Sequence, residues 1–233
     1  MASFESSSLK DSGGDFFKDG FVFVKDGEAG NAVEEMEANS IPFASKRGFE
    51  FFKVNVLDDP RKRRILDSIF EWFGLGLYRT FGAMPGDYAF RQSDPASGPE
   101  SLLVHIWKKG SRVVYWKASH LQQVVTTKGE NNLWRAPRVA LRHAGLEPVE
   151  VTFENGGFSI RDTRLFVEVS EGSAITFGIA SRDVLERWWA PMKLHKSLEE
   201  VVRKIEGPNF GMNVEYFEDK HDVRARPANP PPD

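Results

Sequence analysis

Short runs of apolar residues fill the second half of the chain and predict β-strands. Some runs alternate apolar and polar residues, which is typical of a strand with one buried face, and others are apolar throughout. Gly-containing turns at residues 109–111, 155–157 and 171–173 separate them. The predicted strands cover residues 102–107, 112–118, 149–153, 157–160, 165–169 and 174–180.

The first half carries the stronger helix signals. Residues 29–38 predict a helix, and Asp59 with Pro60 supplies an N-cap and a favoured first helical residue for another. Apolar residues at 66, 69, 70 and 73 continue that helix toward a stop at Gly74. Later helices are predicted after Ser181 and from Ser197, where Glu200 would complete a capping box. Residues 21–25 and 49–57 are interpreted as strands.

Helices followed by many short antiparallel strands indicate a mostly β protein with flanking α-helices. The predicted architecture is a double-stranded β-helix, that is, a jelly-roll or cupin-like barrel. Residues 15–218 are expected to form this single domain. The Ser/Gly-rich residues 1–14 are expected to be flexible, and the Pro-rich residues 219–233 to form a disordered tail.

Composition limits the function classes. The 233 residues include 19 Phe and 6 Trp, which suit an aromatic core or pocket, and the net charge of −3 gives no footprint for nucleic acid. No cysteine is present, so thiol nucleophiles and zinc–thiolate sites are excluded. The chain has neither a secretory signal nor an 18-residue apolar stretch, so we expect a cytoplasmic protein without a membrane partner.

Three segments resemble the phytanoyl-CoA dioxygenase-like branch of the iron(II)/2-oxoglutarate oxygenases. The run FFKDGFVFVKD, starting at Phe16, is similar to the start of that family. Residues 110–120 (GSRVVYWKASH) resemble its strand that ends in a Gly-Ser-His turn, with Ala118 in place of glycine. Residues 156–166 (GGFSIRDTRLF) resemble its Gly-Asp strand before the distal iron-binding histidine. The resemblance implies the barrel fold.

The residues that the family uses for chemistry are missing at the matching positions. The resemblance implies a His-x-Asp pair well before His120, but residues 1–104 contain no histidine. It implies a distal histidine near Val167 and a 2-oxoglutarate arginine near residues 174–178, where neither occurs. Iron(II) needs its facial triad, and a buried dicarboxylate needs a cationic partner. We therefore expect neither a metal nor a cofactor.

Strand alternation selects the candidate site residues. His105 and Arg164 are the predicted catalytic residues, because histidine titrates near neutral pH and arginine can polarise a carbonyl or hold an oxyanion. The predicted substrate-binding residues are Trp107, Tyr115, His120, Asp162, Phe166 and Glu168. Structural roles for the two histidines and a surface Asp162–Arg164 pair remain open alternatives, as does a rearranged metal site of His105, His120 and Glu168.

The sequence thus favours a metal-independent enzyme, a cyclase, isomerase or dehydratase of secondary-metabolite biosynthesis. Its expected partner is a small apolar oxygenated metabolite, and a homodimer is left open. Two other functions are open: a divergent non-haem iron oxygenase with displaced ligands, and a non-catalytic partner of an active dioxygenase.

Overall fold

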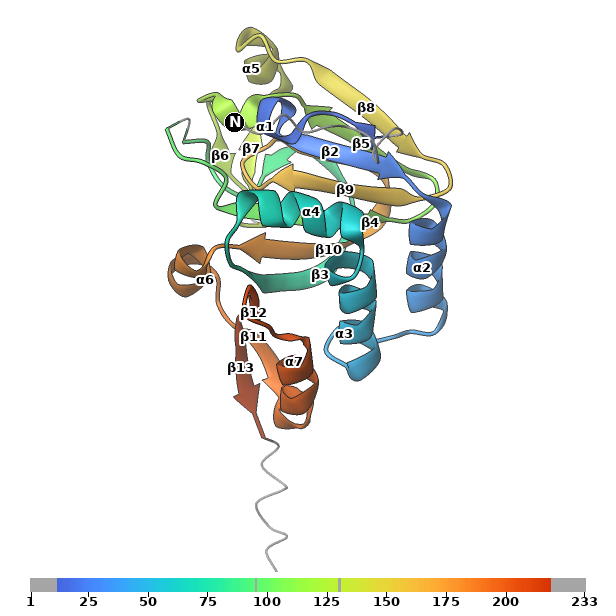
Figure 1. Cartoon of the computed structure of the whole chain (residues 1–233). Helices are drawn as coiled ribbons and strands as arrows, with labels where there is room; N and C mark the ends of the chain where they lie inside the picture. Colours follow the sequence, from blue (N-terminus) through green and yellow to red (C-terminus); the bar gives the residue numbers. More distant parts are fainter. Residues whose placement is uncertain (1–11, 95, 130, 219–233) are drawn as a thin grey trace, which may run out of the picture.

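A computed structural model describes residues 12–94, 96–129 and 131–218, and its body is a mostly antiparallel β-sheet with flanking helices (Figure 1). This confirms the predicted mixture of strands and helices. The predicted tail at residues 219–233 lies outside the described residues, as does most of the predicted flexible N-terminus. Ser12 and Gly13, however, form a short strand β1 that pairs with β2. None of the described helices is long and apolar enough to cross a membrane.

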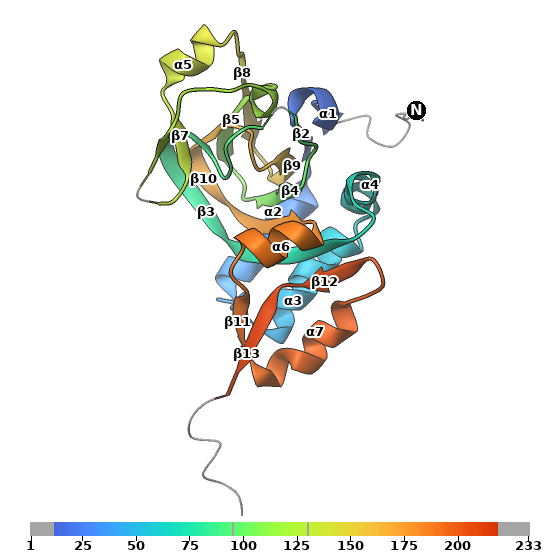
Figure 2. The ribbon, with the colours of Figure 1, turned by 90° about the vertical axis from the view of Figure 1, so that its left-hand side faces the viewer.

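Two long, curved strands organise the sheet. Strand β10 (Val167–Ala180) pairs along its length with β3 (Phe73–Ala89). The C-terminal half of β10 also pairs with β4 (Ser101–Trp107), whereas its N-terminal half pairs with β5 (Ser111–Trp116). The sheet therefore divides into two branches that share β3 and β10, which curve from one branch to the other (Figure 2).

Each branch continues outward through shorter strands. The first branch runs from β4 through β9 (Gly157–Asp162) to β2 (Phe21–Lys25), and β12 (Phe210–Met212) joins β3 in parallel. The second branch adds β8 (Pro148–Phe153) beside β5, with β7 (Trp134–Ala136) and β6 (Thr127–Lys128) beyond β3. The described strands do not close into a barrel, so the predicted double-stranded β-helix stays a prediction.

The predicted turn at residues 171–173 is an irregularity within one strand. Strand β10 contains residues 167–169 of the strand expected at 165–169 and all of the strand expected at 174–180, and it shifts its register between Val169 and Ser173. Gly172 has φ 77°, which favours glycine. A Cβ atom there would also lie 2.4 Å from Ser111 Oγ. The bend lets β10 leave β4 and join β5.

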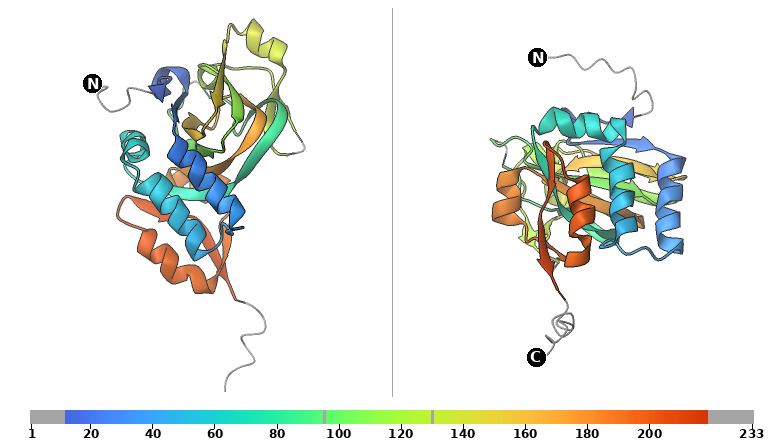
Figure 3. Two further views of the ribbon diagram at one scale, coloured as in Figure 1. Left: turned by 90° about the vertical axis from the view of Figure 1, so that its right-hand side faces the viewer. Right: turned by 60° about the horizontal axis from the view of Figure 1, so that its bottom comes forward.

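Helices cover the outer face of the first branch (Figure 3). They are α2 (Gly27–Ala38), α3 (Lys46–Phe52), the π-helix Lys53–Leu57 and α4 (Pro60–Ile69). The strand predicted at residues 49–57 is therefore wrong. Phe49, Phe52 and Val56 recur at helical spacing and are fully buried, so the apolar pattern follows a helix period that alternation concealed. Phe52 packs on Phe177 of β10 with 5.0 Å between ring centroids.

Several predicted helix ends are corrected. Asp59 caps α4 as predicted, but the helix stops at Ile69, and Phe73 and Gly74 already belong to β3. Helix α6 (Arg182–Trp188) follows Ser181, whose side chain makes no capping hydrogen bond. Helix α7 (Glu199–Ile205) is preceded by a 3-10 turn at Lys196–Leu198, so the predicted capping box from Ser197 to Glu200 does not form.

The C-terminal elements form a small unit against α3. Strands β11 (Met192–His195) and β13 (Val214–Phe217) pair in parallel on either side of α7 in the chain. Leu194 and Val202 share a buried cluster with Phe49 of α3. The remaining short helices are α1 (Phe16–Asp19), the 3-10 turn Ser119–Leu121 and α5 (Arg138–His143).

Candidate small-molecule site

A cavity of about 30 Å³ lies between the two branches of the sheet. We call it the sheet cavity. Its floor is polar and deeply buried, and consists of His105, Trp107, Tyr115 and Arg161. Its mouth is apolar and partly exposed, and includes Phe81, Met84, Tyr88, Phe90, Leu133 and Val169. This volume admits water but no organic molecule, so binding a larger ligand requires the mouth side chains to move.

Arg161 is the unusual group of the floor. Its side chain is buried, with 4% of the residue exposed, and Nη1 donates to the carbonyl oxygen of Leu165 at 3.0 Å. Nε donates to His105 Nε2 at 3.1 Å. Among the described residues no carboxylate forms an ion pair with Arg161, and Nη2 donates to no acceptor. Burial lowers the pKa of Arg161 to about 10, so the guanidinium remains charged at neutral pH.

His105 holds this arginine in place. Because Nε2 accepts a hydrogen bond from Arg161, the proton of the neutral ring belongs on Nδ1, which then donates to Thr176 Oγ1 at 2.8 Å. Burial lowers the pKa of His105 well below its usual value, and the charge of Arg161 lowers it further. His105 is therefore neutral near pH 7, and its only lone pair is occupied. In this geometry His105 orients the Arg161 guanidinium, and its catalytic role stays a prediction.

Trp107 and Tyr115 converge on one hydroxyl group. Trp107 Nε1 donates to Ser159 Oγ at 2.8 Å, and the Tyr115 hydroxyl donates to the same oxygen at 2.9 Å. The Tyr115 ring stacks on Phe21 with 4.4 Å between centroids. Burial raises the pKa of Tyr115, so its phenol stays protonated at neutral pH. Both donors are therefore taken up by Ser159 Oγ, beside a guanidinium that no carboxylate of the described residues contacts.

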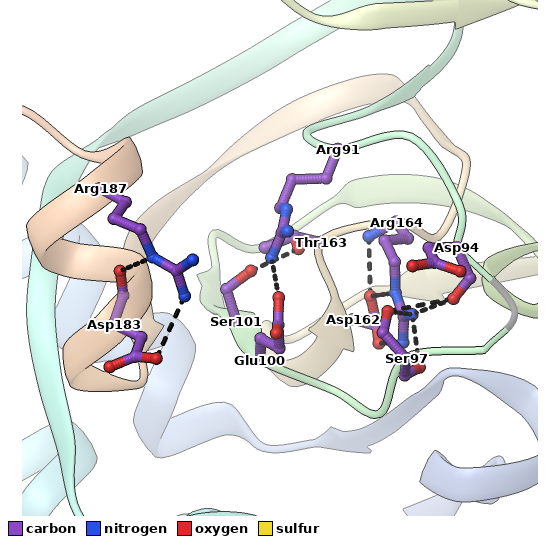
Figure 4. Close-up of polar contacts among 10 residues, drawn as sticks. All are labelled: Arg91, Asp94, Ser97, Glu100, Ser101, Asp162, Thr163, Arg164, Asp183 and Arg187. Carbon is purple, nitrogen blue, oxygen red and sulfur yellow. Dashed lines mark hydrogen bonds and ion pairs between the residues drawn. The ribbon is translucent and has the colours of Figure 1, made fainter.

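Arg164 lies outside this cavity. Its guanidinium pairs with Asp162 at 2.7 Å and donates to the carbonyl oxygens of Asp94 and Ser97, as Figure 4 shows. Burial alone would lower the pKa of Arg164, but the hydrogen bonds and charge of Asp162 outweigh burial and raise it. The protein's own carboxylate and carbonyl oxygens accept the hydrogen bonds of this guanidinium. These hydrogen bonds join the loop before β4 to the end of β9. The catalytic role of Arg164 stays a prediction.

The other predicted residues also lie apart from the sheet cavity. His120 is buried against Gly20, where a Cβ atom would approach its Nδ1 to 2.4 Å, and within the described chain that nitrogen has no hydrogen-bond partner. Glu168 pairs with Arg138. Phe166 packs in a separate apolar cluster. Of the eight predicted residues the cavity collects three, namely His105, Trp107 and Tyr115; the roles of all eight stay predictions.

The donor set does not fit a metal ion. Within the described ranges, no three His, Cys, Asp or Glu side chains lie close enough together to hold one. The alternative metal site of His105, His120 and Glu168 is therefore not assembled. Val167, where the family resemblance places a distal histidine, contributes an apolar side chain to the cavity.

Arg161 was missed in the sequence, although a signal exists. Ser159 and Arg161 alternate with Phe158 and Ile160, so both polar residues occupy one face of β9. The antiparallel register then sets Ser159 opposite His105. The prediction selected Arg164 of the nearby Asp162–Arg164 pair, three residues further along the chain.

Comparison with known proteins leaves the class open. No protein-family model and no curated protein matches the chain. Among solved structures, HygX from Streptomyces hygroscopicus with iron bound is 12% identical, with a TM-score of 0.46 over 77% of this chain and 87% of that chain. The non-heme monooxygenase ThoJ in its apo form is 13% identical, with a TM-score of 0.42 over 70% and 74%. Likeness at this level carries no argument about function, and membership of the dioxygenase-like family stays a prediction.

Proposed function

We propose that this protein is a metal-independent enzyme that binds a small, largely apolar metabolite by an acidic or carbonyl oxygen at Arg161. The observation that supports the proposal is a buried guanidinium without a carboxylate partner. An isolated buried cation costs several kcal/mol, on the order of what an oxyanion ligand would recover. The apolar mouth would contact the rest of the ligand.

The reaction class follows from what the floor supplies. A buried cation such as Arg161 stabilises negative charge that develops on a carbonyl or carboxyl oxygen. That assistance suits an isomerisation, a cyclisation or a dehydration, as the sequence favours. Arg161 takes the oxyanion-holding role that we predicted for Arg164, and His105 positions Arg161 rather than transferring a proton.

A matched pair of probes tests the binding step. Cinnamate and cinnamyl alcohol share an apolar body and differ in the carboxylate, and calorimetry measures their affinities. We expect cinnamate to bind more tightly, and Arg161→Met to weaken it about 100-fold, because a desolvated charge-assisted contact is worth roughly 2–3 kcal/mol. Arg142→Met removes an exposed arginine outside the cavity and serves as the control. Equal affinities of cinnamate for the wild type and Arg161→Met would refute the proposal.

A second measurement separates catalysis from binding. A panel of oxo acids and unsaturated acids is incubated with the protein and EDTA in D2O, and NMR follows deuterium incorporation at carbon. Exchange by the wild type that Arg161→Met abolishes would support a metal-independent enzyme. Binding without exchange across the panel would leave a binding protein and overturn the enzymatic half of the proposal.

A further inference from the structure

A second cleft, of about 570 Å³, lies among the helices on the opposite face of the first branch. We call it the helix cleft. One wall is a face of α2, the other is a continuous face of α3 and the π-helix, and the N-terminus of α4 closes one end. Figure 3 shows α2 and α3 running side by side across the sheet. The volume lies within the range of roughly 300–1,000 Å³ that is usual for small-molecule sites.

Much of each wall is apolar. The apolar wall residues are Ala29, Ala32, Met36, Ile41, Phe51 and Val54. Val54 is 55% exposed. It lies in the π-helix Lys53–Leu57, a rare element that often occurs at functional sites. An apolar ligand body would cover these side chains.

The closed end of the cleft is electrically balanced. Arg61 pairs with Asp26 at 2.7 Å and with Asp59 at 2.8 Å, and Lys62 pairs with Asp59 at 2.6 Å. The Lys62 amine lies 3.9 Å from the centroid of the Phe158 ring. These two carboxylates and two cations neutralise one another and fix the N-termini of α2 and α4 together. They leave no net charge at this end for a ligand to neutralise.

The remaining charges of the cleft are mostly negative. Glu28, Glu35 and Glu50 line it against a single cation, Arg47, and within the described residues these three carboxylates make no ion pair. Asn55 Nδ2 donates to the Phe51 carbonyl oxygen at 3.0 Å, which leaves its Oδ1 available as an acceptor. The unbalanced groups are therefore acceptors, and they suit an ammonium donor.

From this combination we infer that the helix cleft binds a small organic cation, an ammonium group attached to an apolar aryl or alkyl body. The apolar part lies between α2 and the π-helix, and the ammonium group faces the glutamates and Asn55. The site is separate from the sheet cavity in both its residues and its charge preference: one recognises oxyanions and the other recognises cations.

The experiment compares 1-naphthylmethylamine with 1-naphthaleneacetate, which share a ring system and carry opposite charges. Calorimetry at low salt should show binding of the amine and at least tenfold weaker binding of the acid. Ala32→Trp places a large side chain from α2 in the cleft and should weaken binding of the amine at least tenfold. Ala38→Trp adds the same ring at the exposed end of α2, outside the cleft, and should change affinity less than twofold.

Charge variants test the ligand class. Glu35→Gln with Glu50→Gln should weaken binding of the amine about fivefold, because water screens the charge of each exposed carboxylate. Glu186→Gln, on α6, is the control. Circular dichroism checks folding, and Val54→Trp replaces Ala32→Trp if that variant does not fold.

Three results would overturn the inference: equal binding of amine and acid, undiminished amine binding by the cleft-filling variant, or loss of amine binding in Arg161→Met. Loss of amine binding in Arg161→Met would indicate that the amine binds in the sheet cavity and not in the helix cleft. Because Arg161→Met should leave amine binding unchanged, failure of this inference and failure of the proposed function are distinguishable.

Discussion

Two buried arginines three residues apart differ in their partners: a carboxylate pairs with Arg164, whereas none contacts Arg161 among the described residues. Arg164, at the edge of the sheet, shares its charge with Asp162 and donates to two carbonyl oxygens. Arg161, at the floor of the sheet cavity, meets a neutral histidine and backbone oxygens. Removing one partner of a buried ion pair is strongly destabilising, whereas a buried cation that no carboxylate contacts costs stability, which a bound anion would offset. The contrast is the basis on which we propose a binding role for Arg161, while the catalytic role of Arg164 stays a prediction.

The ion cluster at the N-termini of α2 and α4, formed by Asp26, Asp59, Arg61 and Lys62, resembles the Arg164 site because carboxylates of the protein pair with its cations. Lys62 is only 2% exposed, so its charge lies in the protein interior at the start of α4. Burial lowers the pKa of Lys62, and the hydrogen bond and charge of Asp59 offset part of that effect. Each cation of the cluster has a carboxylate partner, so the cluster needs no ligand.

The largest expected effect comes from breaking the Asp162–Arg164 pair. Arg164→Met should lower the free energy of unfolding by about 4 kcal/mol, because it leaves a buried carboxylate without its cation. Arg161→Met should change it by no more than about 1 kcal/mol, since lost hydrogen bonds and relief of an unpaired charge oppose each other. Urea denaturation measures both. A larger loss in Arg161→Met than in Arg164→Met would reverse the assignment, and adding Asp162→Asn should restore part of the stability of Arg164→Met.

The ion cluster should give the next largest effect. Asp59→Ala removes the N-cap of α4 and leaves Lys62 buried without its carboxylate, so we expect a loss of about 3 kcal/mol in thermal or urea unfolding. Asp67→Ala, which breaks the exposed pair with Arg63 on the same helix, should cost less than about 0.5 kcal/mol. Similar losses in the two variants would show that burial of Lys62 contributes nothing.

The smallest expected effect is a decrease in the free energy of unfolding as the pH falls into the acid range. Burial would raise the pKa of Asp59, but hydrogen bonds from Arg61 and Lys62, together with their charges, hold it well below its usual value. The native state then binds fewer protons than the unfolded state, so the contribution of Asp59 is complete above the unfolded pKa near 4 and is lost as the pH falls. After solvent screening we expect about 1 kcal/mol. Unfolding curves between pH 6 and 2 should fall less steeply for Asp59→Asn, and parallel curves would contradict the expectation.

Local chemistry made part of the fold predictable. Turn residues and β-type runs predicted the strands that became β4, β5, β8 and β9, and Asp59 with Pro60 predicted the start of α4. Residues 49–57 were misread because their apolar residues satisfy a period of two as well as a helical period. The long strand β3 was missed because its glycines are required by distant residues. A Cβ atom at Gly76 would lie 2.1 Å from Trp189 Cε3.

Part of the candidate site could also be predicted from the sequence. Alternation placed His105 and Trp107 on one face of a strand and selected Tyr115 on the next, and the structure brings the three to one cavity. The role of Arg164 could not be judged in the same way. Its partners Asp94 and Ser97 lie about 70 residues earlier in the chain, and only the folded loop brings them to its guanidinium.

The sequence alone therefore determined the class of secondary structure, the aromatic character of the interior and the absence of residues for a facial iron triad at the family positions. These depend on residue identity and local spacing. Tertiary structure decided which charges meet partners remote in the chain, because those distances depend on strand register and helix packing. Only the register of β4 and β9 brings His105 beside Arg161, and only helix packing brings Arg61 to Asp26 and Lys62 over the Phe158 ring.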